Sequence, residues 1–200
     1  DWGRNGTSIA ISNIPFDTNA AYFSNRSYSS WGNNISFVNG PTWTGSCRVG
    51  GCMWLDGSND YLFVASSSTN NNTAGTITFW MKTNGSWGTG DSSPDNDAIL
   101  WERERVGGTV QGMYIYQQTP ANGGDLILVA ASGGSNQIVL NPSTKNLTDN
   151  AWHFIAVVYT QGSGTSGYMT AYIDGVNVSS SAQSAPWFWQ AIPQEIGKDV

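Results

Sequence analysis

Charged side chains are scarce in this chain, and their scarcity excludes several classes of partner. Only 11% of the 200 residues are charged, the net charge is −6, and the Lys and Arg residues form no cluster. Nucleic acids and anionic membrane surfaces are bound through concentrated positive charge. No apolar run reaches the roughly 18 residues that a membrane-spanning helix needs. The sequence therefore predicts neither a nucleic-acid partner nor membrane insertion.

Histidine and cysteine are also rare. The single histidine, His153, lies inside a strand-like run, which excludes a Ser-His-Asp triad and a metalloprotease helix. We expect His153 on the surface of its strand. The two cysteines, Cys47 and Cys52, are too few for a zinc site, and they enclose only Arg-Val-Gly-Gly. We predict a disulfide, which adds about 2 kcal/mol by closing so short a loop and is typical of proteins outside the cytosol.

Helical periodicity is missing from the whole chain. Short apolar or alternating runs are instead separated by turns rich in Gly, Asn and Pro, and 10 Trp, 8 Tyr and 7 Phe supply the bulk of a core. This pattern predicts an all-β, antiparallel β-sandwich. The predicted strands span 53–55, 61–64, 76–83, 98–105, 112–117, 126–131, 137–140, 152–160, 168–173 and 176–178.

Two of the predicted strand pairs are hairpins. Residues 168–173 and 176–178 flank Asp174-Gly175, the residue pair that favours a two-residue turn with positive φ. Residues 53–55 and 61–64 flank Asp-Gly-Ser-Asn, which predicts a second hairpin.

Four segments together resemble one known family. They are the strand that begins Trp152-His153 and continues to Tyr172-Ile173-Asp174-Gly175-Val176, the run from Gly51 to Leu62, the strand from Thr76 to Lys82, and Glu195-Ile196-Gly197-Lys198. In this order they resemble the concanavalin A-like lectin/glucanase superfamily, in its laminin-G-like form. The resemblance implies a jelly-roll sandwich over residues 14–200, preceded by an N-terminal arm or edge strand at residues 1–13.

Carboxylates suggest two kinds of site. Asp91, Asp95, Asn96 and Asp97 concentrate oxygen ligands of the type that calcium prefers, and Asp95-Asn96 resembles the calcium-binding pair of pentraxins. The alternative is a solvated acidic loop. A second calcium candidate joins Asp17 to Asp199, because related modules often carry a structural calcium near their ends.

A catalytic interpretation rests on Glu102 and Glu104. Alternation puts both on one strand face, roughly 6–7 Å apart, as in glycoside hydrolases of this superfamily. The spacing differs from the longer Glu-x-Asp-x-x-Glu run of those enzymes, so we expect no enzyme activity.

The aromatic run Trp187, Phe188 and Trp189 departs from the family pattern. Two tryptophans two residues apart share a face of an extended chain and suit sugar stacking or a protein interface. The alternative is that these rings pack on the core of their own domain.

The chain also stops where the family continues into a closing strand. We expect the missing strand to be supplied from outside the chain or by the arm, where Ile9 and Ile11 alternate.

Asn-x-Ser/Thr sites agree with an extracellular or cell-surface glycoprotein. There are seven of them, at Asn5, Asn25, Asn34, Asn71, Asn84, Asn146 and Asn177. The sequence thus predicts a non-catalytic secreted or cell-surface module for adhesion or glycan recognition. The alternatives are a subunit of an extracellular filament, which binds copies of itself, and a glycoside hydrolase.

Overall fold

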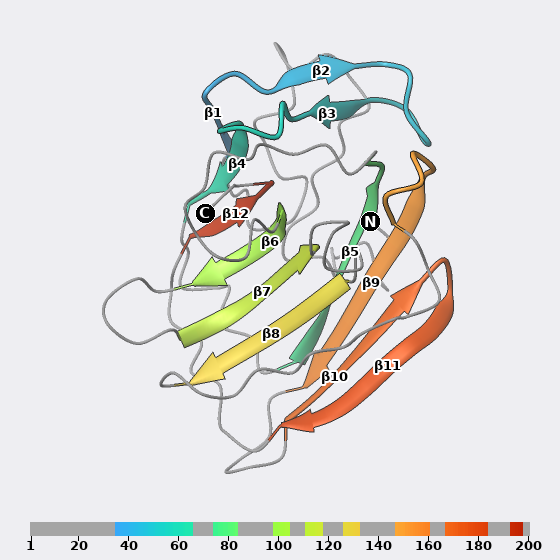
Figure 1. Cartoon of the computed structure of the whole chain (residues 1–200). Coiled ribbons are helices and arrows are strands. Elements are labelled where there is room, and N and C mark those ends of the chain that lie inside the picture. Colours follow the sequence, from blue (N-terminus) through green and yellow to red (C-terminus); the bar gives the residue numbers. More distant parts are fainter. Residues whose placement is uncertain are drawn as a thin grey trace, which may run out of the picture.

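The computed structural model of the chain consists of antiparallel strands that form two packed sheets and a short hairpin (Figure 1). It describes residues 35–65, 74–83, 98–104, 111–117, 126–132, 147–160, 167–183 and 193–197. Every element in these ranges is a strand, which confirms the predicted all-β sandwich. No helix in the described ranges is long and apolar enough to span a membrane.

The larger sheet has six strands in the order β1-β4-β12-β6-β7-β8. Their bounds are β1 Ile35–Val38, β4 Tyr61–Val64, β6 Ala98–Glu104, β7 Gln111–Gln117, β8 Leu126–Ser132 and β12 Gln194–Ile196. The last of these strands in the chain therefore lies inside the sheet, between β4 and β6.

The second sheet has four strands in the order β11-β10-β9-β5. Their bounds are β5 Ala74–Met81, β9 His153–Thr160, β10 Gly167–Ile173 and β11 Val176–Gln183. The β10–β11 hairpin was predicted correctly, because Asp174 and Gly175 both have positive φ, at 52° and 80°.

The main core lies between the two sheets. It combines Ile155 and Val157 of β9, Met169 and Ile173 of β10, and Ile115 of β7 from the opposite sheet, each 0% exposed. A second cluster of Ile35, Leu62 and Val64 lies within the β1–β4 pair. Ile196 of β12 packs against both clusters, so this three-residue strand connects them.

The predicted hairpin between residues 53–55 and 61–64 is wrong. Strand β3 (Cys52–Trp54) pairs with β2 (Thr42–Thr44), and this pair crosses one end of the sandwich, at the top of Figure 1. Strand β4 pairs instead with β1 and β12. The physical reason is that Leu62 and Val64 of β4 belong to the core, whereas Cys52 at the start of β3 is bonded to Cys47 beyond the end of β2.

Gly197 ends β12 in a conformation and a position that a side chain cannot share. Its φ is +77°, and a Cβ atom there would overlap the Leu55 side chain, which follows β3. Gly175 has nearly the same φ, +80°, but a Cβ atom there would meet nothing within 4 Å. A side chain at Gly175 would therefore cause backbone strain alone, whereas one at Gly197 would cause backbone strain and steric overlap.

We predict that Gly197→Ala lowers the free energy of unfolding by about 2–4 kcal/mol, from positive-φ strain together with overpacking against Leu55. Gly175→Ala, with the strain alone, should cost about 1 kcal/mol. Urea unfolding measures both values. Equal losses in the two variants would show that the Leu55 contact has no energetic role.

Candidate functional site

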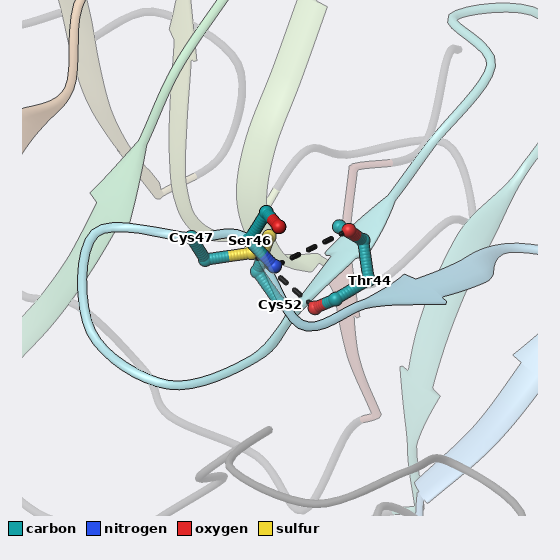
Figure 2. Close-up of a disulfide and its surroundings, with 4 residues drawn as sticks. All are labelled: Thr44, Ser46, Cys47 and Cys52. Carbon is teal, nitrogen blue, oxygen red and sulfur yellow. Dashed lines mark hydrogen bonds between the residues drawn. A yellow bond between two sulfur atoms is a disulfide. The ribbon is translucent and has the colours of Figure 1, made fainter.

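A disulfide closes the loop that joins β2 to β3 (Figure 2). Cys47 and Cys52 are bonded, with their Cα atoms 5.9 Å apart, which confirms the predicted pairing. The Ser46 amide donates to Thr44 Oγ1 at 3.4 Å, and Cys47 Sγ lies 3.4 Å from the Thr44 carbonyl oxygen. The residue next to Cys47 is Arg48, which is exposed.

The surface of the four-stranded sheet turned away from the core is here called the outer face. Its members are uncharged side chains from β5, β9 and β10. Register places them in three rows: Trp80 with Phe154; Thr78 with Ala156 and Tyr172; and Thr76 with Val158 and Thr170. The aromatic side chains of such a surface can pack against the ring of a ligand.

Trp80 is the largest side chain of the outer face. Its ring centroid lies 5.2 Å from that of Phe154, with the planes tilted by 51°. The Arg48 guanidinium carbon lies 5.1 Å from the Trp80 ring centroid, within cation–π distance. With both neighbours in contact, 41% of Trp80 is still exposed. The site therefore combines an aromatic surface with a guanidinium that lies over its largest ring.

Sequence reasoning missed Trp80 and Arg48 as site residues. The alternation of residues 74–81 contained a usable signal, since Thr76, Thr78 and Trp80 share the face opposite to the apolar Ile77 and Phe79. A tryptophan at the end of this threonine-lined strand face is a candidate contact for a ligand, because large aromatic side chains are enriched in binding surfaces. No sequence signal places Arg48 beside Trp80, because the two are 32 residues apart and meet through the fold.

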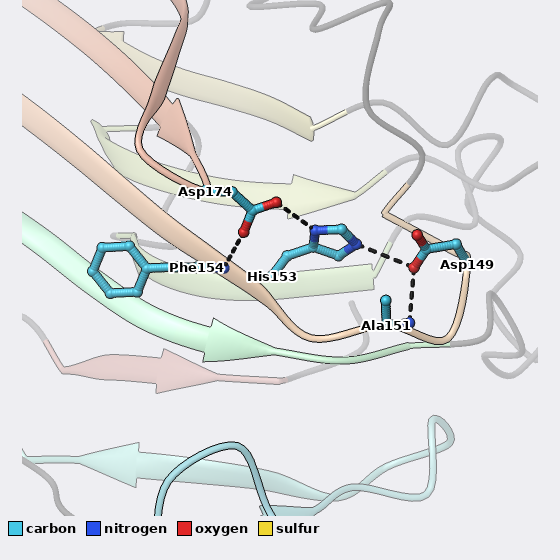
Figure 3. A network of polar contacts seen from close by, with 5 residues as sticks. All are labelled: Asp149, Ala151, His153, Phe154 and Asp174. Atoms are coloured by element: carbon cyan, nitrogen blue, oxygen red, sulfur yellow. Dashed lines mark hydrogen bonds and ion pairs between the residues drawn. The ribbon is translucent and has the colours of Figure 1, made fainter.

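The expectation that His153 is a strand-surface residue is wrong. His153 is only 7% exposed and lies between two carboxylates, as Figure 3 shows. Its Nδ1 is 2.9 Å from Asp174 Oδ2, and its Nε2 is 3.1 Å from Asp149 Oδ1. The pairing of Ile155 with Ile173 brings the Asp174-Gly175 turn beside the start of β9. The Trp-His and Asp-Gly motifs of the sequence are thus in contact in the fold, through His153 and Asp174.

Further hydrogen bonds fix both carboxylates. Asp174 Oδ1 accepts from the Phe154 amide at 2.9 Å, and the Asp174 amide donates to the Phe154 carbonyl at 2.9 Å. Asp149 Oδ1 accepts from the Ala151 amide at 2.8 Å, and Leu147, two residues earlier, is 0% exposed in the core. Both carboxylates therefore have structural roles, and Phe154, which the network orients, lies beside Trp80.

The network favours the charged form of His153. A carboxylate only accepts hydrogen bonds, so an imidazole that bonds to one through each nitrogen needs both protons. Burial opposes the charge, but the hydrogen bonds to Asp174 and Asp149 outweigh it and raise the pKa of His153 above its ordinary 6.5. The Ala151 amide and the His153 contact lower the pKa of Asp149 below 3.8.

The Asp-Gly-Ser-Asn-Asp segment is a turn and not a ligand site. Asp56 Oδ1 accepts from the Ser58 amide at 2.9 Å, the Asn59 amide at 3.3 Å and the Asp60 amide at 3.4 Å. The Asp56 amide donates in return to Asp60 Oδ2 at 3.2 Å. The Ser58 amide contributes most to lowering the pKa of Asp56, and the exposed carboxylate serves as an internal cap.

Several predicted sites lie outside the described residues. These are the aromatic run Trp187, Phe188 and Trp189, the calcium candidates Asp91, Asp95, Asn96, Asp97, Asp17 and Asp199, and the glycosylation candidates Asn5, Asn25, Asn34, Asn71, Asn84 and Asn146. Asn177 is described: it lies in β11, exposed, and opposes Tyr172 in register. Within the described ranges, no three His, Cys, Asp or Glu side chains gather to hold a metal ion.

The candidate carboxylates for catalysis lie in β6. Backbone pairing places Glu102 opposite Tyr114 of β7 on one side and Glu195 of β12 on the other. Glu195 was not among the residues predicted from the sequence to matter for catalysis. The hydrolase interpretation of Glu102 and Glu104 stays a prediction.

A family model matches residues 56–200, which is more than half of the chain, and it describes the concanavalin A-like lectin/glucanase superfamily. The chain therefore belongs to this superfamily. The match includes all of the outer face and the His153 network, whereas Arg48 and the disulfide loop precede it.

Individual relatives are distant. The neuronal pentraxin receptor of Rattus norvegicus is 28% identical over 94 residues, which cover 45% of this chain and 18% of that protein. Botulinum neurotoxin type C, which depends on two ganglioside molecules to enter cells, matches in structure with a TM-score of 0.57 and 14% identity, over 97% of this chain and 44% of the toxin chain. The binding domain of Paraclostridial Mosquitocidal Protein 1 matches with a TM-score of 0.52 and 15% identity, over 88% of this chain and 42% of that chain. At such identities the structural matches show the fold, and the chain spans less than half the length of each of these proteins.

The His153 network predicts a stability that depends on pH. The pKa of His153 is higher in the folded protein than its ordinary 6.5, so its contribution is fully present below about pH 6.5 and is lost as pH rises through the folded value. The pKa of Asp149 is lowered, so its contribution is present above about pH 3.8 and is lost as pH falls through the folded value. The melting temperature, measured as a function of pH, should therefore show the largest stabilisation by the network between about pH 3.8 and pH 6.5.

His153→Gln should flatten the fall in melting temperature above about pH 6.5, because glutamine does not titrate. Asp174→Asn retains an acceptor for the Phe154 amide but loses both the charge and the second acceptor oxygen that faces His153 Nδ1, so it should also flatten the profile. A wild-type profile parallel to that of His153→Gln from pH 5 to 9 would contradict the assignment.

Proposed function

We propose that this chain is a non-catalytic, extracellular or cell-surface binding module that recognises glycans through the outer face around Trp80. The observation that carries the proposal is an exposed indole on an uncharged sheet face, beside a guanidinium. Sugar rings present C–H faces that pack on aromatic rings and hydroxyls that accept hydrogen bonds. Trp80 supplies the first kind of contact and Arg48 the second.

The surroundings of Trp80, and not its exposure alone, support a binding role, since Trp54 is more exposed, at 63%. Ile77 and Phe79 of the same strand pack against the core, whereas Trp80 lies on the opposite face with Phe154 and Arg48 against its ring. Phe154 and Arg48 both contact the Trp80 ring, and contacts of this kind reduce the conformational freedom that is lost when a ligand binds. The eight positions in the three rows of the outer face carry no charge, and Lys82 lies beyond them, after the end of β5.

Family and relatives favour the same class. The superfamily takes its name from lectins and glucanases, one structural relative is a toxin that depends on gangliosides, and another is a toxin binding domain. The pentraxin receptor and the Cys47–Cys52 disulfide agree with a location outside the cytosol. Glycosylation at Asn177, which is exposed on β11, belongs to the same proposal.

The only histidine does not favour catalysis. His153 bonds to a carboxylate through each ring nitrogen, so neither nitrogen is available to accept a proton from a substrate. The geometry of this network therefore supports a structural role, in agreement with a non-catalytic module.

Trp80→Ala should weaken glycan binding by about fivefold or more, because stacking of a ring on an aromatic side chain contributes roughly 1–3 kcal/mol by alanine substitution. Trp54→Ala is the matched control, since Trp54 is 63% exposed but lies in β3, which does not belong to the four-stranded sheet. Binding to a broad glycan array, followed by calorimetry on the strongest glycan, measures the effect. Circular dichroism checks that both variants fold.

Two outcomes would contradict this proposal. If wild-type protein binds no glycan on the array, glycan recognition is wrong. If Trp80→Ala binds as well as Trp54→Ala while a Trp187→Ala, Trp189→Ala double variant does not bind, the ligand lies on the aromatic run predicted from the sequence.

The structural-subunit alternative rests on a different observation. Among the described strands, β5 is an edge of the four-stranded sheet, and an edge strand can pair with a strand from another chain. Completion of the sandwich by residues 1–13, from the same or another copy, stays a prediction, as does calcium in the loop from Asp91 to Asp97.

A further inference from the structure

Arg48 has an exposed guanidinium with no carboxylate partner in the described part of the chain. Its guanidinium carbon lies over the Trp80 ring, 5.1 Å from the ring centroid. The chain has 14 acidic residues and only 8 basic ones. An exposed arginine that faces an aromatic ring and not one of these carboxylates retains its planar set of donors for a ligand.

A second cation lies close to Trp80 in the sequence. Lys82 follows β5 two residues after Trp80 and is exposed, so it continues the alternation that puts Trp80 on the outer face. The Lys and Arg residues of the described ranges are Arg48, Lys82 and Arg103, and two of these three belong to the neighbourhood of Trp80. The nearby carboxylates of Asp149 and Asp174 are directed to His153.

We infer that the glycan recognised at this site bears a carboxylate, as uronic and sialic acids do, and that Arg48 binds this carboxylate while the sugar ring packs on Trp80. This inference rests on the proposed function and specifies its ligand class. A guanidinium forms two parallel hydrogen bonds with a carboxylate, and the Arg48 guanidinium lies over the Trp80 ring. A neutral sugar offers Arg48 only hydroxyl acceptors, whose hydrogen bonds are weaker than those of a carboxylate.

The net charge of the protein does not favour the binding of an anionic glycan, so a preference for carboxylate-bearing glycans must come from local contacts. With a net charge of −6, long-range attraction does not draw an anionic glycan to the surface. At about 0.15 M salt the screening length is roughly 8 Å, so the local cations decide binding. The preference should therefore depend on Arg48 itself and persist at physiological salt.

The experiment compares carboxylate-bearing glycans with their methyl esters, which keep the ring and remove the charge. An array with both forms and with neutral glycans is probed with wild type, Arg48→Gln, Arg48→Lys and Trp80→Ala. Wild type should bind the acids at least about fivefold more tightly than the esters, because hydrogen bonds to charged groups are the stronger ones. Arg48→Gln should bind both forms equally, and Arg48→Lys should recover part of the preference.

Each outcome separates the two proposals. Equal binding of acids and esters by wild type, or a preference that survives in Arg48→Gln, overturns the carboxylate inference and leaves glycan recognition at Trp80 intact. Binding of sulfated glycans only also overturns it. If wild type binds no glycan at all, both proposals fail. Because Arg48 is exposed, Arg48→Gln should fold, and its melting temperature checks this.

Discussion

The antiparallel pairing of β9 with β5 on one side and β10 on the other is the constraint on which the rest depends. Side chains alternate along a strand, so one register decides both faces of the sheet. It directs Ile155 and Val157 into the core against Ile115 of the opposite sheet, and it directs Phe154 outward beside Trp80. A slip of one residue would exchange the two faces and would remove the core and the candidate site together.

The same pairing explains why the site lies at one end of the sheet. It brings the β10–β11 turn beside the start of β9, where Asp174 binds both the Phe154 amide and His153. The outer face needs only one more part, the guanidinium of Arg48, and the disulfide loop supplies it from the β2–β3 hairpin. Three segments that are distant in the sequence therefore form one surface.

Local features of the sequence were sufficient to predict most strands, the Asp174-Gly175 turn and the Cys47–Cys52 bond. Each of these depends on residues that are close in the chain, such as a turn pair or two cysteines separated by four residues. The pairing of β3 could not be predicted, because β1 and β12, which are distant in the sequence, occupy both sides of β4. The burial of His153 was missed for a similar reason: its partner Asp174 lies 21 residues away.

The central claim, that a glycan packs on Trp80 in the outer face, is tested most directly by nuclear magnetic resonance of the tryptophan indole N–H groups. The chain has 10 Trp, and Trp80→Phe and Trp54→Phe variants assign two of the signals. Titration with a glycan that wild type binds should shift the Trp80 signal to saturation and leave the Trp54 signal unchanged. A saturable shift confined to other tryptophans, with the Trp80 signal constant, would contradict the account.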